Sequence, residues 1–302
     1  MHESKIINLL YKTIKKESSD CYYLNQNRLV TTDSLAEGTH FLLAWSSPEQ
    51  IAEKLVEVNV SDIAAGGGYP THAFLNLGLN EFTSETNWIT RFVKKFRKCL
   101  DKYSIQISGG DTYFSKTTNL TLSLLGNTIR KTSREKGRLG DYLYLSGYTG
   151  YSLLGYQILS KRKDQIPKSI KQKAILTHLA PSSEFFLAKK LVRDKSIHAM
   201  MDVTDGLLQD LEKLSSSSGL GFEVYLDEFW DKHPLKKIIS LDESLSSGEE
   251  LKLLILSKKK LPKSYNLIQL GIATNVTGVK YYQLGKKLKF SKKGYLHFKN
   301  NS

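Results

Sequence analysis

The sequence predicts two α+β domains in tandem, each built from its own sheet and helices. Along the first half, strand-like apolar segments alternate with helix-like segments, and the second half opens with a strand again after a polar, basic stretch at 130–138. At 302 residues the chain is long enough for two domains, and 40% hydrophobic with 25% charged residues is typical of a soluble globular protein. We therefore expect domains at residues 1–132 and 133–302.

The first half carries four expected strands and three expected helices. The strands lie at 29–32, 73–79, 105–108 and 120–129, where apolar residues run together or alternate. A helix at 49–58 is opened by Ser47-Pro48, and a helix at 85–103 repeats Trp88, Phe92 and Phe96 at helical spacing. The apolar residues of 6–14 fit a short amphipathic helix that packs on the domain.

The second half carries four expected strands and three expected helices. Strands are expected at 142–145, 222–226, 251–256 and 267–272. Helices are expected at 151–160, at 182–193 and at 207–214. We interpret 215–219 as the frayed end of the last helix with Gly219 as its cap.

Composition excludes several classes of protein. No segment has the length and apolarity of a membrane span, and the N-terminus lacks the apolar core of a signal peptide. Two cysteines form no disulfide framework, which favours the cytoplasm. The net charge is +14, but 36 of the 44 basic residues are lysine, whereas base recognition favours arginine. We therefore expect no membrane and no nucleic acid among the partners.

Five short acidic segments point to chemistry. They lie at 18–21, 31–41, 59–65, 108–112 and 202–206, and most of them follow or close an apolar run. Each places an aspartate beside small or hydroxyl residues. Because hard cations such as Mg²⁺ take oxygen ligands together with bound phosphates, five such segments predict a polyphosphate site crowded with metal.

Two of the three acidic segments in the first 65 residues also allow simpler interpretations. Asp33 with its neighbouring threonines could hold Mg²⁺ and His40 could meet a phosphate, or the segment could be a polar turn after an edge strand. Asp62 lies where the expected helix ends in a glycine-rich bend, so it is either an exposed residue at a helix end or a buried carboxylate. Because Ile63 and Ala64 beside it are apolar, we favour a carboxylate that needs a cation.

Two later segments combine glycine with aspartate. Gly109 and Gly110 follow an expected strand, where they could cradle phosphate through backbone N–H groups or form a hairpin turn. Thr204 and Asp205 precede an expected helix, whose N-terminus favours anions, although Asp205 could simply cap that helix. Two acids flanking one hydroxyl, at 202–205, exceed what capping requires.

No residue pattern supplies an obvious general base or nucleophile. The sequence has no zinc-type cysteine–histidine cluster and no Gly-x-Ser-x-Gly elbow. A kinase acting on a hydroxyl would need a base, but a phosphate monoester is already anionic near neutral pH. Repulsion between two anions is then the chemical problem, and metal ions solve it.

These segments resemble, in order and spacing, those of the thiamine-monophosphate kinase family, part of the larger group built like aminoimidazole ribonucleotide synthetase. The string Glu37-Gly38-Thr39-His40-Phe41 is the most specific, and the resemblance extends from about Ser18 to Phe298. It implies a mixed-sheet first domain that dimerises, then an α+β domain, with the site between them. It also implies transfer of the ATP γ-phosphate directly onto thiamine monophosphate, with several Mg²⁺ ions.

The resemblance assigns roles to individual positions. It implies metal ligands at Asp20, Thr31, Thr32, Asp33, Asp62, Asp111, Asp202 and Asp205. It implies contacts to ATP from Gly110, Asp111, Arg134 and Thr204, and contacts to the acceptor from His40, Glu249 and Tyr295. Asp33, Asp62 and Asp111 are expected to gather metals at the reacting phosphates.

The sequence departs from the family pattern at four places. Ser18-Ser19-Asp20 replaces Gly-Asp-Asp, Gly66 replaces a methionine, Thr204 replaces a serine, and Glu250-Leu251-Lys252 replaces Asp-Tyr-Glu after Glu249. Two alternatives therefore stay open: another ATP-using enzyme of the wider group, and a nucleotide-binding homologue that has lost catalysis.

Overall fold

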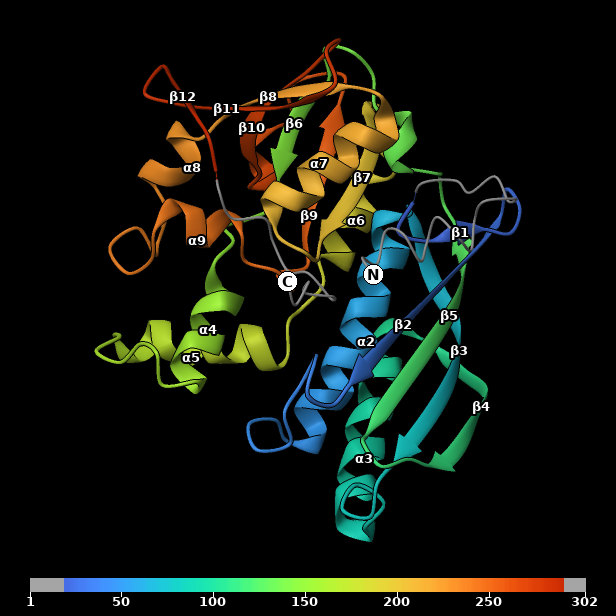
Figure 1. Ribbon diagram of the computed structural model, residues 1–302. Coiled ribbons are helices and arrows are strands. Elements are labelled where there is room, and N and C mark those ends of the chain that lie inside the picture. Colours follow the sequence, from blue (N-terminus) through green and yellow to red (C-terminus); the bar gives the residue numbers. More distant parts are fainter. Residues whose placement is uncertain (1–18, 291–302) are drawn as a thin grey trace, which may run out of the picture.

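The computed structural model describes residues 19–290, which form two sheets joined through a central helix (Figure 1). The helix expected at 6–14, Ser18 and Tyr295 lie outside the described residues. Within residues 19–290, no helix combines the length and apolarity needed to cross a membrane.

The first sheet has five strands in the order β1-β2-β5-β3-β4. Neighbouring strands are antiparallel except β3 and β4, which are parallel because helix α3 crosses between them. Helices α2 and α3 cover one face of this sheet (Figure 1). The elements are β1 Tyr22–Tyr23, β2 Arg28–Ala36, α2 Pro48–Ala65, β3 Gly68–Leu79, α3 Thr86–Tyr103, β4 Gln106–Phe114 and β5 Asn119–Thr128.

The two faces of this sheet differ in character. Leu122 and Leu124 of β5 are fully buried beneath the helices. On the opposite, open face, Phe74 of β3 is 44% exposed and Tyr113 of β4 is 49% exposed. No helix or strand among residues 19–290 covers this open face, and several predicted site residues lie on it.

The second sheet has seven strands in the order β12-β11-β8-β10-β6-β9-β7. Its strands are antiparallel except β8 and β11, which are parallel. The strands are β6 Tyr142–Leu145, β7 Ile197–Val203, β8 Gly221–Tyr225, β9 Lys252–Ser257, β10 Ile268–Thr274, β11 Gly278–Gln283 and β12 Lys286–Leu288. The helices are η1 Arg134–Lys136, α4 Tyr151–Leu159, α5 Lys168–Leu179, α6 Phe185–Leu191, α7 Leu207–Ser218, α8 Asp227–Asp231, α9 Leu241–Leu245 and η2 Lys263–Tyr265.

Helix α2 lies in the core between the two sheets. Leu55 of α2 belongs to the same buried cluster as Met200 of β7 and Ile255 of β9. The alternate residues of those strands, such as Val203 and Leu254, pack with α7 on the other face. Alternation along β7 therefore points Asp202, like Met200, toward α2.

Local sequence explains where α2 begins and ends. Ser47 accepts the N–H of Gln50 and the Gln50 side chain accepts the N–H of Ser47, and Pro48 fills the first turn. The helix continues to Ala65, so the expected end near residue 58 is wrong. Gly67, at φ +77°, then turns the chain into β3.

Most expected elements are confirmed, with some wrong boundaries. The expectation that Gly109-Gly110 follows a strand is wrong, because both glycines lie inside β4. There, a Cβ on Gly110 would meet the carbonyl oxygen of Leu75 at 1.8 Å, so backbone packing by itself requires glycine. Gly219 does cap α7, but the helix runs to Ser218 and is not frayed.

His233 is a buried neutral histidine that makes the fold sensitive to acid. It is 4% exposed, its Nε2 donates to the carbonyl of Thr149 (3.0 Å), and its Nδ1 accepts from the N–H of Leu235 (3.1 Å). Burial lowers the pKa of His233 from near 6.5 to about 4. Its contribution to stability is therefore present above pH 6.5 and is lost as the pH falls toward 4.

We predict that the stability advantage of the wild type over His233→Gln shrinks by about 2 kcal/mol between pH 7 and pH 4.5. Urea unfolding of both proteins at each pH measures this difference, and taking the difference cancels titrations common to both chains. A stability difference that stays constant over this range contradicts the assignment.

Candidate functional site

Three buried carboxylates converge between the sheets. One oxygen from each of Asp20, Asp62 and Asp202 lies within 4.8 Å of the others. Asp20 precedes β1, Asp62 lies in the last turn of α2, and Asp202 lies on β7. The cluster therefore joins the first sheet, the central helix and the second sheet.

Neighbouring hydroxyl groups orient these carboxylates. Thr31 Oγ1, on the buried side of β2, donates to Asp62 Oδ2 at 2.6 Å. Ser61 Oγ donates to Asp202 Oδ2 at 2.6 Å. Both hydrogen bonds leave the second oxygen of each carboxylate for another partner.

Asp33 lies beside this cluster on the same face of β2. Its backbone N–H donates to Asn59 Oδ1 of α2 at 3.0 Å. Burial first, and then the nearby charges of Asp20 and Glu249, raise the pKa of Asp33 to about 6. Burial and neighbouring carboxylates likewise raise the pKa values of Asp62 and Asp202.

The carboxylates have too little positive charge around them. Within residues 19–290, the ion pair of Asp20 with Arg134 is the only one that Asp20, Asp33, Asp62 or Asp202 makes. Asp20 Oδ2 is buried without a hydrogen-bond partner. Asp62 also lies at the negative end of the α2 dipole, and the last turn of α2 holds no basic residue.

This donor set fits a hard divalent cation. Converging carboxylate oxygens, an unpartnered Asp20 Oδ2 and adjacent hydroxyls are the ligands that Mg²⁺ prefers. A cation there would offset the burial and the charge repulsion that raise the pKa values of these carboxylates.

A second group of residues lies nearer the N-terminus of α2. Lys54 Nζ donates to Glu249 Oε2 at 2.8 Å and to the carbonyl oxygen of His40 at 2.7 Å. The eight residues from Lys54 to Asp62 correspond to about 12 Å along a helix axis. Helix α2 therefore separates two ends of one site, with His40 and Glu249 at one end and the carboxylates at the other.

The remaining predicted metal residues are not brought into the cluster. Thr32 lies on the open face of the first sheet, where Ser123 Oγ donates to its Oγ1 at 2.9 Å. Asp111 lies on the same open face. It is aligned across the sheet with Asn76, Thr121 and Ser34, and this row alternates with the buried row of Leu122. Asp205 turns toward α7, where it pairs with Lys213.

The comparisons with known proteins agree with this geometry. The model of the AIR synthase related protein N-terminal domain matches residues 18–128, and that of the C-terminal domain matches 139–263. A thiamine-monophosphate kinase of Leptospira interrogans is 45% identical over 302 residues, covering 99% of this chain and 98% of that protein. The chain belongs to the thiamine-monophosphate kinase family.

Solved structures give the same fold. The structure of AaThiL complexed with AMPPCP and TMP has a TM-score of 0.83 at 29% identity, covering 98% of this chain and 97% of that one. The thiamine monophosphate kinase of Aquifex aeolicus has a TM-score of 0.82 at 28% identity, covering 95% of this chain and 97% of that one. The α+β, two-domain architecture like that of aminoimidazole ribonucleotide synthetase is thereby confirmed.

Two departures from the thiamine-monophosphate kinase pattern have structural explanations. A Cβ at Gly66 would lie 2.2 Å from Cys21 Sγ, so Cys21 fills the space that a side chain at 66 would take. Glu250 is buried and its Oε1 accepts the N–H groups of Gly150 (2.7 Å) and Ser152 (2.9 Å), at the start of α4. Glu250 thus supports the fold next to Glu249.

Sequence reasoning missed two buried charged residues that contact predicted site residues. Lys54 interrupts the apolar stripe of Ile51, Leu55 and Val58 on α2, and that interruption is the signal. Asp210 of α7 is fully buried and accepts the N–H groups of Thr204 and Asp205 at 2.9 and 3.0 Å. An acid three residues after Leu207, on the buried face of α7, is a weaker signal.

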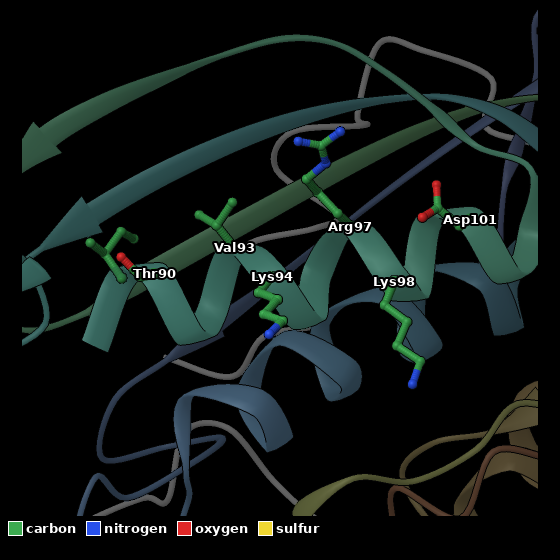
Figure 2. Close-up of a pocket in the computed structure, with 7 residues that line it drawn as sticks. Thr90, Val93, Lys94, Arg97, Lys98 and Asp101 are labelled. Atoms are coloured by element: carbon green, nitrogen blue, oxygen red, sulfur yellow. The ribbon is translucent and has the colours of Figure 1, made fainter. Parts of the chain in front are cut away.

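A separate surface hollow of about 700 Å³ lies along α3 (Figure 2). One side of α3, from Ile89 to Asp101, lines it, and it contains none of the predicted site residues. Figure 2 shows Lys94, Arg97 and Lys98 extending from this helix. It belongs to the outer surface of the first sheet's helical layer.

Proposed function

We propose that this protein transfers the γ-phosphate of ATP to thiamine monophosphate, which yields thiamine diphosphate and ADP. The observation that carries this proposal is the buried cluster of Asp20, Asp62 and Asp202, built to concentrate cations where phosphates meet. The AaThiL structure, which holds AMPPCP and TMP, supports the choice of ATP as donor and thiamine monophosphate as acceptor.

The chain's own residues bind and orient the two substrates. Arg134 and Thr204 contact ATP near the cluster, and Gly110 and Asp111 of β4 are further contacts to ATP. His40 and Glu249 contact the acceptor, with Tyr295 beyond the described residues. Thr31, Asp33 and the three clustered aspartates hold several Mg²⁺ ions, with Thr32, Asp111 and Asp205 as further ligands.

The transfer is in-line and forms no phosphoenzyme. The acceptor phosphate is already anionic near neutral pH, so no side chain has to remove a proton from it. Bound Mg²⁺ would reduce the repulsion between donor and acceptor phosphates. Catalysis then consists of holding the two phosphates in line, which fixed groups at the two ends of α2 can do.

We further propose that two copies of this chain form a homodimer through the open face of the first sheet. Phe74 and Tyr113 are 44% and 49% exposed on this face, and among residues 19–290 β4 is an unpaired edge. Asp111 and Thr32 lie on it, away from the cluster of their own chain. A dimer could bring them to a metal site of the partner subunit.

The two predicted domains supply different parts of the proposed site and of the dimer interface. Residues 1–132 supply most metal ligands and the dimer face, and residues 133–302 supply Arg134, Asp202, Thr204 and Glu249. The cytoplasm is the proposed compartment, since Cys21 and Cys99 are buried free thiols.

The direct test is to incubate the purified protein with ATP, Mg²⁺ and thiamine monophosphate and to quantify thiamine diphosphate and ADP. We expect both products in equal amounts, and neither without Mg²⁺. ATP binding without ADP formation across a panel of phosphorylated acceptors would support an inactive homologue instead. ADP formation with a different acceptor would support another enzyme of the wider group.

The homodimer predicts a mass near twice 34.2 kDa in sedimentation equilibrium. Phe74→Lys buries a charge at the proposed interface and is expected to weaken the dimer by about 100-fold or more. Leu176→Lys is the matched control, because Leu176 is 56% exposed on α5, away from this face. A monomeric wild type, or a Phe74→Lys variant that associates normally, contradicts the proposal.

A further inference from the structure

Lys54 is a buried lysine that none of the family motifs includes. It is 1% exposed, and it lies on α2 among Ile51, Leu55 and Val58, which are buried and apolar. Burying an ammonium group is costly unless all its donors are paired. A leucine at this position would suit the core better, so the charge needs another explanation.

The three donors of Lys54 reach three different segments. Nζ lies 2.8 Å from Glu249 Oε2, 2.7 Å from the carbonyl oxygen of His40, and 3.5 Å from the carbonyl oxygen of His178. His40 follows β2 of the first sheet, whereas His178 and Glu249 belong to α5 and to the turn before β9. One side chain therefore ties both halves of the molecule together at the acceptor end of the site.

The turn that carries Glu249 is unusually constrained. Glu249 and Leu251 have φ of +54° and +51°, a left-handed conformation that favours glycine. The N–H of Glu249 donates to the carbonyl of Thr204 at 2.7 Å, and that of Leu251 donates to the carbonyl of Val203 at 3.0 Å. The backbone of the turn is thus fixed to the end of β7, and Lys54 fixes the side chain.

The Glu249 carboxylate keeps one oxygen for a ligand. Its side chain is 30% exposed, and among residues 19–290 no hydrogen-bond partner contacts Oε1. The neighbouring His178 does not compete as a cation, because burial and the charge of Lys54 lower its pKa to about 4. Oε1 is thereby presented toward an acceptor that carries a cationic ring or N–H donors.

We propose that Lys54 is a positioning residue for the acceptor: it holds Glu249 and the His40 segment in the geometry that binds the organic part of the acceptor. This proposal depends on the proposed function for its substrate but not for its geometry. Lys54 touches neither phosphate, so its loss should affect acceptor binding and leave ATP binding nearly unchanged. The effect should also pass through Glu249 and not add to it.

A double-mutant cycle tests this coupling. We expect Lys54→Met to raise KM for thiamine monophosphate about 30-fold and to change KM for ATP less than about twofold. Glu249→Gln should have a similar effect, and the double variant should be little worse than either single variant. Lys54→Arg, which keeps the charge, should recover much of the loss. Single-variant losses that multiply, or equal rises in both KM values, overturn the proposal.

The matched control is Lys95→Met. Lys95 of α3 makes an ion pair of the same length, 2.8 Å, with Glu53 of α2. This ion pair joins two helices of the first sheet's layer, so the Lys95→Met variant is expected to leave both KM values unchanged. If Lys54→Met does not fold, Lys54→Gln, which keeps a polar end on a shorter chain, replaces it in the cycle.

Hydrogen exchange separates this proposal from the proposed function. In the substrate-free protein, Lys54→Met should speed amide exchange in the segment 248–251 about 10-fold or more, while Lys95→Met should not. If the wild type makes no thiamine diphosphate, the proposed function fails, and this measurement still decides the role of Lys54. Unchanged exchange in 248–251 overturns the positioning role.

Discussion

Replacing Asp62 by asparagine is expected to lower kcat by about 10³-fold and, without metal, to make the fold more stable. Asp62 is buried, lies near the charges of Asp33 and Asp202, and is at the negative end of α2, so its charged form is disfavoured in the folded protein. Asparagine keeps a hydrogen-bond acceptor for Thr31 Oγ1 but removes the charge. Activity falls because a cation ligand is lost, and stability rises because a repulsion is lost.

Mg²⁺ titration of thermal stability distinguishes this account from simple damage to the fold. In the wild type, Mg²⁺ should raise Tm, since a cation that binds only the folded state adds about 2.7 kcal/mol at 100 times its Kd. In Asp62→Asn the metal-free Tm should be higher and the Mg²⁺ response much smaller. Glu49→Gln, which removes an exposed ion pair with Arg91, should change neither property. Near-native turnover, or a full Mg²⁺ response, in Asp62→Asn contradicts the metal assignment.

The pH dependence of the metal-free protein has a definite sign. The folded-state pKa of Asp33 is raised to about 6, so its contribution is present below pH 4 and is lost as the pH rises through 6. The raised pKa values of Asp62 and Asp202 act in the same direction. Without metal, the cluster should therefore lower stability toward neutral pH, and Mg²⁺ should bind more tightly as the pH rises.

Most of the fold could be predicted from the sequence because its elements carry local signals. The helical spacing of Trp88, Phe92 and Phe96 gave α3 to within a residue at its start. Helix α5 was not predicted, since only Ala174 and Leu179 are buried on it and its apolar stripe is correspondingly weak. The strand expected at 105–108 is shorter than β4, because the Gly-Gly pair resembles a turn when only the local sequence is considered. In the structure, pairing with β3 keeps these glycines extended.

The candidate site was predictable in type but not in assembly. The sequence predicts Asp33 at the end of a strand and Asp62 at the end of a helix. The structure places both near Asp20 and Asp202. Which face of a strand a residue occupies depends on register, which local sequence does not reveal. Asp111 was therefore grouped with Asp33 from sequence, although the two lie on opposite faces of one sheet.

That separation makes Asp111 the residue with the most informative variant. Asp33 shares its row with Leu122, Leu75 and Gly110 beneath α2, and the row of Asp111 lies on the open face. If Asp111 ligates metal, it acts on the site of the partner subunit in the proposed dimer. Asp111→Asn should then lower kcat by about 10²- to 10³-fold. The fold and the rise in Tm on adding Mg²⁺ should stay largely intact.

Mixing two inactive variants tests this arrangement. After subunit exchange between Asp62→Asn and Asp111→Asn chains, half of the dimers are mixed, and each mixed dimer has one site with both native residues. Activity should therefore return to about a quarter of the wild-type value, although neither parent is active. If Asp111 serves its own chain, every site in the mixture lacks one aspartate and no activity returns. Phe74→Lys placed in both chains should abolish the recovery, because the recovered site exists only where two copies meet.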